Sequence, residues 1–312
     1  MLSSLEASLG VVAPMAVLIA LGVLIRRLGL VSREDMAPLD RLIFKLFMPL
    51  MLFRNVYDMD LRHSFSGEHM AYVLLGVSLT FLLGLYLVRR LPDRRQAGAI
   101  AQAVVRPNCV LFGVAAAEAL YGAGNAGISA MVGAIAVPLT NVFAVVVLEM
   151  SRESRPDGKK ILLAVAKNPL ILAAALGLVL NGMAVPLPSL AYDAVKSLGG
   201  VTTTLSFLSL GVSLSAGEMR ANRRPLALGI LLRMVLIPLV LLPPAVLLGF
   251  RDQRLFSLVT LFAAPAAVTS YPMAVAYDAD GPLAGQLVCF TSLAAVFTIF
   301  FCTFILRALG YL

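Results

Sequence analysis

The stretch AVVRPNCVLFG, residues 103–113, interrupts an otherwise apolar segment with a guanidinium, a proline and a carboxamide. An arginine at the centre of a membrane span costs about 2.5–3.5 kcal/mol on insertion scales. Pro107 removes a backbone donor, and its ring clashes with the preceding turn. The carbonyls freed by such a break are tolerated only where protein or water satisfies them. Arg106, Pro107 and Asn108 together therefore predict a broken helix that lines an internal site.

A second stretch, PAAVTSYPMA at residues 265–274, has the same character, because two prolines bracket small polar residues. Both stretches lead into a short apolar run that ends in a tyrosine, Tyr121 or Tyr277. Broken helices at corresponding positions of two inverted repeats are typical of secondary transporters. The pair predicts an inverted repeat, with one copy over about 7–150 and the other over about 161–308.

The composition is that of an integral membrane protein. Of the 312 residues, 60% are hydrophobic and 13% are charged, whereas soluble domains are roughly 25% charged. Apolar runs recur near the length of about 20 residues that crosses a bilayer. They predict an all-α membrane protein, a single domain over residues 1–312, with ten transmembrane helices. The predicted spans are 7–25, 42–60, 70–88, 98–120, 126–149, 161–183, 189–215, 225–249, 255–277 and 283–306.

Lysine and arginine residues are concentrated on one side of these spans. The loops after odd-numbered spans carry fifteen of them, including Arg89 and Arg155. The loops on the other side carry six, including Arg62. The positive-inside rule assigns the richer side to the cytoplasm. Both termini are therefore expected to be non-cytoplasmic, in a multi-pass protein of the cell (inner) membrane. The net charge of +8 follows from this arrangement, and no nucleic-acid partner is expected.

The two interrupted stretches supply the candidate substrate-binding residues. These are Arg106, Pro107, Asn108, Thr269, Ser270, Tyr271 and Pro272. An amide donor such as Asn108 beside a half-helix N-terminus suits an anion. Arg106 either joins the site or snorkels to the cytoplasmic side. The hydroxyls of the second stretch either line a cavity or bond back to their own helix in an ordinary kink.

Three other polar residues are candidates for coupling. Glu118 follows Asn108 by about three helical turns and, with a raised pKa, would carry a proton; alternatively it is a solvated residue at the outer end of its span. Arg233 and Lys167 lie about a third of the way into their spans from the cytoplasmic side. Each is either a structural ion-pair partner or a charge compensator.

No cofactor, metal ion or enzyme activity is expected. GAGNAG at 122–127 fits a dinucleotide-binding glycine pattern, but it follows a membrane helix and lacks an acidic residue about 20 positions later. DADG at 278–281 begins like a calcium loop, but its twelfth position is Cys289. The three cysteines fall within predicted spans, which argues against a disulfide framework or a zinc site.

Six segments, taken in order, resemble the auxin efflux carrier family over nearly all of residues 7–308. They are LFMPLMLFRNV (46–56), RPNCVLFGVA (106–115), KNPLILAAALGLVLN (167–181), LSLGVSLS (208–215), PAAVTSYPMA (265–274) and TSL (291–293). The chain departs from the family pattern at Val110, Ala115 and Thr269, where members carry glycine, proline and, in many cases, asparagine. Pro107 is then the residue that would open the fourth span in place of Ala115.

The resemblance implies a fold related to that of the bile acid–sodium symporters. Spans 1, 2, 6 and 7 would form a scaffold, expected to make a homodimer, and spans 3–5 and 8–10 a mobile domain in which broken helices 4 and 9 cross. A small carboxylate or aromatic organic acid would bind beside the crossing, and an elevator-like movement would expose it to each side. The coupling ion would be a proton or sodium, unless the protein is a uniporter driven by the membrane potential.

Two other classes compete with this reading. A membrane-embedded enzyme would need intramembrane acids or a metal-binding set, and the spans hold almost none. A non-transporting membrane sensor or receptor with the same fold is the alternative that the departures at Val110 and Ala115 keep open. Uptake of an organic acid into vesicles separates a transporter from such a receptor.

Overall fold

The computed structural model describes residues 2–58, 66–122, 126–152 and 158–312. All regular elements among these residues are helices. In chain order they are α1 (Leu2–Arg27), α2 (Arg33–Leu42), the π-helical turn η1 (Ile43–Phe47), α3 (Met48–Tyr57), α4 (Gly67–Arg90), α5 (Arg94–Val105), α6 (Cys109–Tyr121), α7 (Gly127–Arg152), α8 (Gly158–Ala166), α9 (Pro169–Gly182), α10 (Ser189–Ser213), α11 (Ala216–Ala221), α12 (Arg223–Leu231), the π-helical turn η2 (Leu232–Leu236), α13 (Ile237–Leu247), α14 (Asp252–Phe262), α15 (Ser270–Ala276) and α16 (Gly281–Ala308). Arg62 lies outside the described residues, as do residues 153–157 between the two predicted repeats, which include Arg155.

Four helices of the described chain have the length and apolar composition to cross a membrane. They are α4, α7, the continuous helix Arg223–Leu247 and α16, with 24, 26, 25 and 28 residues. A bilayer core about 30 Å thick needs about 20 helical residues, so each of these four is long enough. The shorter helices α6 and α9 are also apolar. The division of the whole chain into ten spans stays a prediction.

Three of the predicted spans are divided into two helices. The segment 98–120 separates into α5 and α6, and the segment 255–277 into α14 and α15, at the two stretches predicted to be interrupted. The segment 161–183 is also divided, because Asn168 begins a new helix. Its side-chain oxygen accepts a hydrogen bond of 2.8 Å from the Leu170 N–H, and Pro169 stands at the first helical position, where proline is favoured.

The second predicted span begins earlier than residue 42. Ser32 and Asp35 form a capping box that starts α2 at Arg33, and α2 continues through η1 into α3. The Asp35 carboxylate accepts hydrogen bonds from the Ser32 hydroxyl and backbone, which lower the pKa of Asp35. The helix therefore includes Asp40, which is buried, although the sequence places it before the predicted span.

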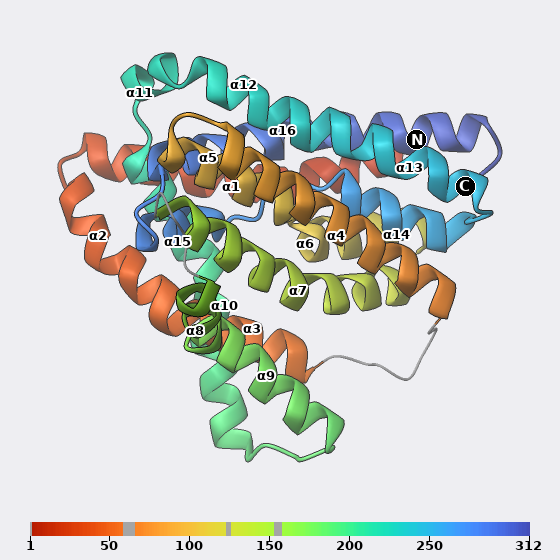
Figure 1. Cartoon of the computed structure of the whole chain (residues 1–312), viewed down its shortest axis with the longest axis horizontal. Coiled ribbons are helices and arrows are strands. Elements are labelled where there is room, and N and C mark those ends of the chain that lie inside the picture. The colour runs from red at the N-terminus through yellow and green to blue at the C-terminus, as the bar shows by residue number, and fades with distance from the viewer. Residues whose placement is uncertain (1, 59–65, 123–125, 153–157) are drawn as a thin grey trace.

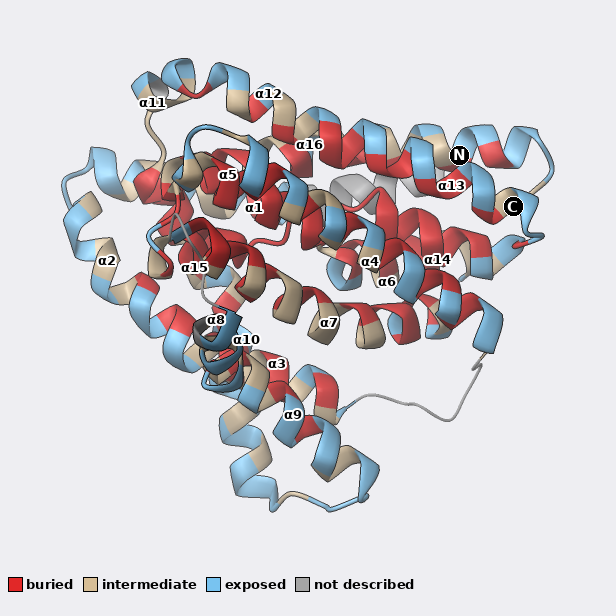
Figure 2. Cartoon of the chain, in the orientation of Figure 1, coloured by how far each residue is buried: buried red, intermediate tan, exposed pale blue. Residues whose placement is uncertain are grey.

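The helices surround a buried centre made largely by the two interrupted segments. Figure 2 shows that burial is concentrated on α5, α14 and α15, while α9 has few buried residues and the lower part of α10 is mostly exposed. Helices α3, α9 and α10 project together from one side of the molecule in Figure 1, and α1 runs beside α10. Both chain ends lie at the right-hand end of Figure 1, whereas α2 and α11 lie at the opposite end.

The contact between α1 and α10 depends on two facing glycines, which allow the backbones to approach closely. A Cβ atom built on Gly211 would lie 2.9 Å from the Gly22 Cα and closer still to the Ile19 carbonyl oxygen. Since both neighbours are backbone atoms, neither side has a side chain that can move aside.

Gly211→Ala is expected to destabilise the protein by about 1–3 kcal/mol, the usual cost of overpacking. Thermal unfolding of the purified protein in detergent should show a Tm lower by several degrees. Gly200→Ala on the same helix is the matched control, because no heavy atom lies within 4 Å of its added methyl group. Equal Tm values for the two variants would contradict the close approach of α1 and α10.

Candidate functional site

The two interrupted segments pair with each other through their backbones. The Asn108 N–H donates a hydrogen bond of 2.8 Å to the Pro265 carbonyl, and the Ala267 N–H donates one of 3.0 Å to the Arg106 carbonyl. These bonds make an isolated antiparallel bridge between Pro107 and Ala266. Each break thus satisfies polar groups of the other, as a break inside a membrane protein requires.

A threonine of α16 supports the second break. The Ala266 N–H donates a hydrogen bond of 3.0 Å to the Thr291 hydroxyl, and that hydroxyl donates in turn to the Leu287 carbonyl at 2.6 Å. Thr291 is fully buried. It belongs to the TSL segment at 291–293 noted in the sequence, so the role of this segment is to hold the non-helical backbone that follows α14.

Arg233 joins the ends of both half-helices that lead into the breaks. It lies in the π-helical turn η2 and is 1% exposed. Its guanidinium donates to three backbone carbonyls, at 2.8 Å to Ala264, 3.1 Å to Val104 and 3.0 Å to Leu261. A positive charge at a helix C-terminus is favourable, so Arg233 compensates the C-terminal ends of α5 and α14 together.

A cavity of about 310 Å³ adjoins the paired breaks. It is lined by residues from several helices, so it lies where the interrupted segments meet α3, α7 and α10. The polar residues that line it are Arg54, Asn55, Arg106, Asn108, Thr140, Asn141, Thr203 and Thr269. A small number of polar groups in a largely apolar cavity of this size is typical of a binding site for a small molecule.

Two side-chain amides at the cavity have unused hydrogen-bonding capacity. The Asn108 Nδ2 is buried and has no hydrogen-bond partner among the described residues. The Asn141 Nδ2 donates to the Val137 carbonyl at 2.7 Å, but its buried Oδ1 has no partner in the same part of the chain. An unsatisfied buried polar atom is unfavourable, so these two atoms are candidates for hydrogen bonds to a ligand.

Two guanidinium groups also reach the cavity wall. Arg106 is 5% exposed, and its Nη1 lies 3.7 Å from the Met273 sulfur. Arg54 of α3 is about one-third exposed and makes a 3.5 Å ion pair with Asp58 one turn later. Both residues line the cavity, Arg54 from α3 and Arg106 from the break between α5 and α6.

The structure brings together four of the seven predicted substrate-binding residues. Arg106, Pro107, Asn108 and Thr269 line the cavity. The other three lie on α15 and are buried without lining it, namely Ser270, Tyr271 and Pro272. Tyr271 instead pairs with the Ser213 hydroxyl of α10.

The predicted coupling residues lie away from the cavity. Glu118 on α6 and Lys167 at the junction of α8 and α9 are exposed. Arg233 is buried beneath the paired breaks and does not line the cavity. Whether any of the three takes part in coupling stays a prediction.

Several cavity residues escape prediction from the sequence. Arg54 and Asn55 come directly after the MPLMLF segment, where Arg54 resembles an ordinary loop charge. Asn141 lies three residues after Pro138, inside α7, and resembles an interhelical hydrogen-bonding residue. The position of Asn55 and Arg54 at the end of a proline-containing apolar segment is the one signal that would have suggested them.

The architecture is that of an integral membrane protein with an internal cavity that carries a few polar groups. A family model described as "Membrane transport protein" matches residues 7–303. The chain therefore belongs to this membrane transport family, the auxin efflux carriers. A relative from Methanothermobacter thermautotrophicus, named an uncharacterized transporter, is 25% identical over 278 residues, covering 87% of this chain and 89% of the relative. The chain is thus a multi-pass membrane protein of a transporter family.

Proposed function

We propose that the protein is a secondary transporter or uniporter for a small organic anion, a carboxylate or an aromatic organic acid. One observation carries the proposal: the buried Asn108 Nδ2 has no hydrogen-bond partner among the described residues, and Asn108 lines a 310 Å³ cavity beside two paired helix breaks. A cavity of this volume suits a small molecule. The family supports transport as the activity.

The charges around the cavity favour an anion. Asn108 stands at the N-cap of the 13-residue helix α6, and its side chain makes no capping hydrogen bond. The positive end of a helix dipole attracts an anion, and Arg54 and Arg106 add two guanidinium groups. We assign the substrate carboxylate to the Asn108 Nδ2 and the nearby cations, with Thr269 and Asn141 contacting the rest of the molecule.

The transport cycle in this proposal is an elevator-like movement. The scaffold consists of predicted spans 1, 2, 6 and 7, and the mobile domain of spans 3–5 and 8–10, as two inverted repeats. The backbone bonds between the two breaks support a mobile domain that carries both breaks as one unit. In this proposal two copies form a homodimer through their scaffold helices, and this scaffold stays fixed while each mobile domain moves.

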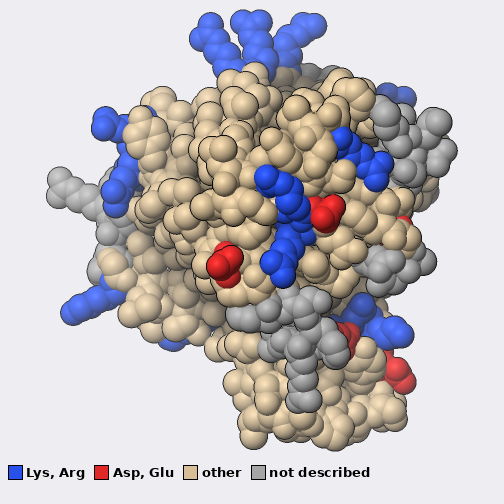
Figure 3. All heavy atoms as spheres, turned by 90° about the vertical axis from the view of Figure 1, so that its right-hand side faces the viewer, with Lys and Arg blue, Asp and Glu red and all other residues tan. Residues whose placement is uncertain are grey.

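The distribution of charge supports termini outside the cytoplasm. Figure 1 places both chain ends at one end of the molecule and the Arg-rich α11–α12 region at the other. Figure 3 looks onto the end that holds the termini, and most of this face carries no charged side chain. The positive-inside rule then assigns the opposite end to the cytoplasm of a bacterial-type cell membrane.

Uptake into proteoliposomes tests the proposed function. Purified protein is reconstituted and given labelled indole acids and malonate-like diacids under pH and voltage gradients. Accumulation of at least one acid, beyond that in protein-free vesicles, is the expected result. Binding of an acid without flux under every gradient would instead identify a membrane sensor with the same fold.

Arg54→Gln is expected to weaken binding of the transported acid about tenfold or more, because a hydrogen bond to a charged group is worth about 1.5–3 kcal/mol. The measurement is the substrate concentration at half-maximal uptake. Arg41→Gln, on the same continuous helix but exposed and away from the cavity, is the control. An unchanged affinity in Arg54→Gln would remove Arg54 from the site.

A further inference from the structure

A carboxylate is buried where α2 packs against α10 and α15. Asp40 of α2 precedes the predicted span 42–60 and is 2% exposed. The Ser209 hydroxyl of α10 donates a hydrogen bond of 2.6 Å to its Oδ1. No ion pair to Asp40 is present among the residues that the structure describes. A buried carboxylate without a cation is expensive to keep ionised, so this place favours the binding of a proton.

Asp40 is connected to the candidate site through α15. The Ser209 hydroxyl that binds Asp40 lies one turn before Ser213 on α10. The Ser213 hydroxyl in turn pairs with the Tyr271 hydroxyl of α15. Helix α15 packs against α2, η1 and α10. Tyr271 follows Thr269 by two residues, and Thr269 lines the cavity. A change at Asp40 therefore reaches a cavity residue through one turn of α10 and less than one turn of α15.

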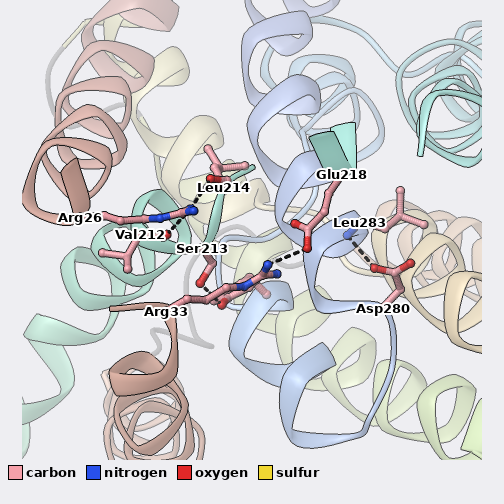
Figure 4. Close-up of polar contacts among 9 residues, drawn as sticks. Arg26, Arg33, Val212, Ser213, Leu214, Glu218, Asp280 and Leu283 are labelled. Atoms are coloured by element: carbon pink, nitrogen blue, oxygen red, sulfur yellow. Dashed lines mark hydrogen bonds and ion pairs between the residues drawn. The ribbon is translucent and has the colours of Figure 1, made fainter. Parts of the chain in front are cut away.

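The charged groups on the surrounding elements are engaged elsewhere or exposed. They are Arg33, Glu34, Asp35 and Arg41 of α2, Lys45 of η1, Asp193 and Lys196 of α10, and the nearby Arg26 and Glu218. Figure 4 shows that Arg26 binds the Val212 and Leu214 carbonyls and that Arg33 pairs with Glu218. The two cations nearest in sequence to Asp40 are exposed, and α15 carries no charged residue. The charge of Asp40 is therefore set by a proton and not by a neighbouring cation.

We propose that Asp40 is the proton-binding site that couples this transporter to a pH gradient, an inference that rests on the proposed function. When ionised, the carboxylate accepts a hydrogen bond from Ser209. Ser213, one turn later on α10, pairs with Tyr271, and this arrangement holds α15 against α2 and α10. A proton from water forms an O–H bond on one carboxyl oxygen, which then donates a hydrogen bond instead of accepting one. The hydrogen bond with Ser209 rearranges, the Ser213–Tyr271 pair weakens, α15 is released, and the proton returns to water after the movement.

Infrared difference spectroscopy tests proton binding without any substrate. Wild-type protein in liposomes is titrated over the acidic to neutral range, and the carbonyl stretch of protonated carboxyl groups is recorded. A component of this band is expected to disappear in Asp40→Asn and to remain in Asp193→Asn, which changes an exposed aspartate of α10. An identical titration in wild type and Asp40→Asn would overturn the assignment, whether or not the protein transports an acid.

Accumulation of the acid identified by the uptake panel tests coupling. With the membrane potential clamped at zero, coupling to one proton gives about tenfold accumulation per pH unit. Asp40→Asn should still equilibrate the acid but lose accumulation. Tyr271→Phe should keep the infrared band but also lose accumulation. If Asp40→Asn does not fold, Tyr271→Phe takes its place in the flux assay. Wild-type accumulation in Tyr271→Phe would overturn the proposal, whereas absence of flux in the wild-type protein would refute the proposed function instead.

Discussion

Asn108→Ala is expected to lower the affinity for the transported acid by about 10- to 100-fold, since a hydrogen bond to a charged group contributes about 1.5–3 kcal/mol. The free protein should remain stable. The Asn108 Nδ2 has no partner to lose among the described residues, and the side chain makes no capping bond to α6. Its backbone N–H, which does pair with Pro265, is retained in alanine.

The measurement is the ligand-induced rise in Tm, with uptake as a second readout. The matched control is Gln102→Leu on α5. Gln102 is also a buried amide whose side-chain atoms have no partner in the described part of the chain, but it does not line the cavity. Ligand stabilisation should vanish in Asn108→Ala and persist in Gln102→Leu. Equal loss in both variants would mean that the effect comes from the region of the break and not from contact with the ligand.

The breaks are predictable from the sequence because the signal is local. Proline cannot donate a backbone hydrogen bond, and a lone polar residue in an apolar run needs a reason to be there. Arg106-Pro107-Asn108 and the stretch 265–272 therefore indicate interruptions without any knowledge of their neighbours. The structure interrupts the chain at both, and the two pair with each other.

The walls of the cavity are not predictable in the same way. Arg54, Asn141 and Thr203 come from α3, α7 and α10, and whether they meet depends on how these helices are rotated about their axes. That rotation is decided by packing, for example by the close approach at Gly199, where a Cβ would lie 2.9 Å from the Met51 backbone nitrogen. No residue pattern within one helix contains this information.

Asp40 illustrates a different limit. The apolar run that predicts a span begins at about residue 42, so the sequence assigns Asp40 to a loop. The capping box at Ser32 and Asp35 starts the helix earlier, and this places Asp40 on a helical face against α10. A capping signal far from the apolar run changes an apparent loop charge into a buried group.

Arg233→Met is expected to prevent folding or to lower the Tm severely. Methionine fills a similar length but donates no hydrogen bond, so the carbonyls of Val104, Leu261 and Ala264 would lose the donors seen at 2.8–3.1 Å. Each unsatisfied buried carbonyl costs about 1–3 kcal/mol, and three of them approach the total stability of about 5–15 kcal/mol typical of a protein. The yield of monodisperse protein and its Tm are the measurements.

Two further variants separate this role from a general need for charge. Arg233→Lys keeps the positive charge but lacks the planar fork that reaches three acceptors, so its Tm should lie between those of wild type and Arg233→Met. Arg224→Met removes an exposed arginine from the same continuous helix and should leave the Tm unchanged. If Arg233→Met folds with the wild-type Tm, the half-helix ends are held by other contacts. If Arg233→Lys matches wild type, charge alone is sufficient, because the geometry of the three hydrogen bonds then contributes nothing to stability.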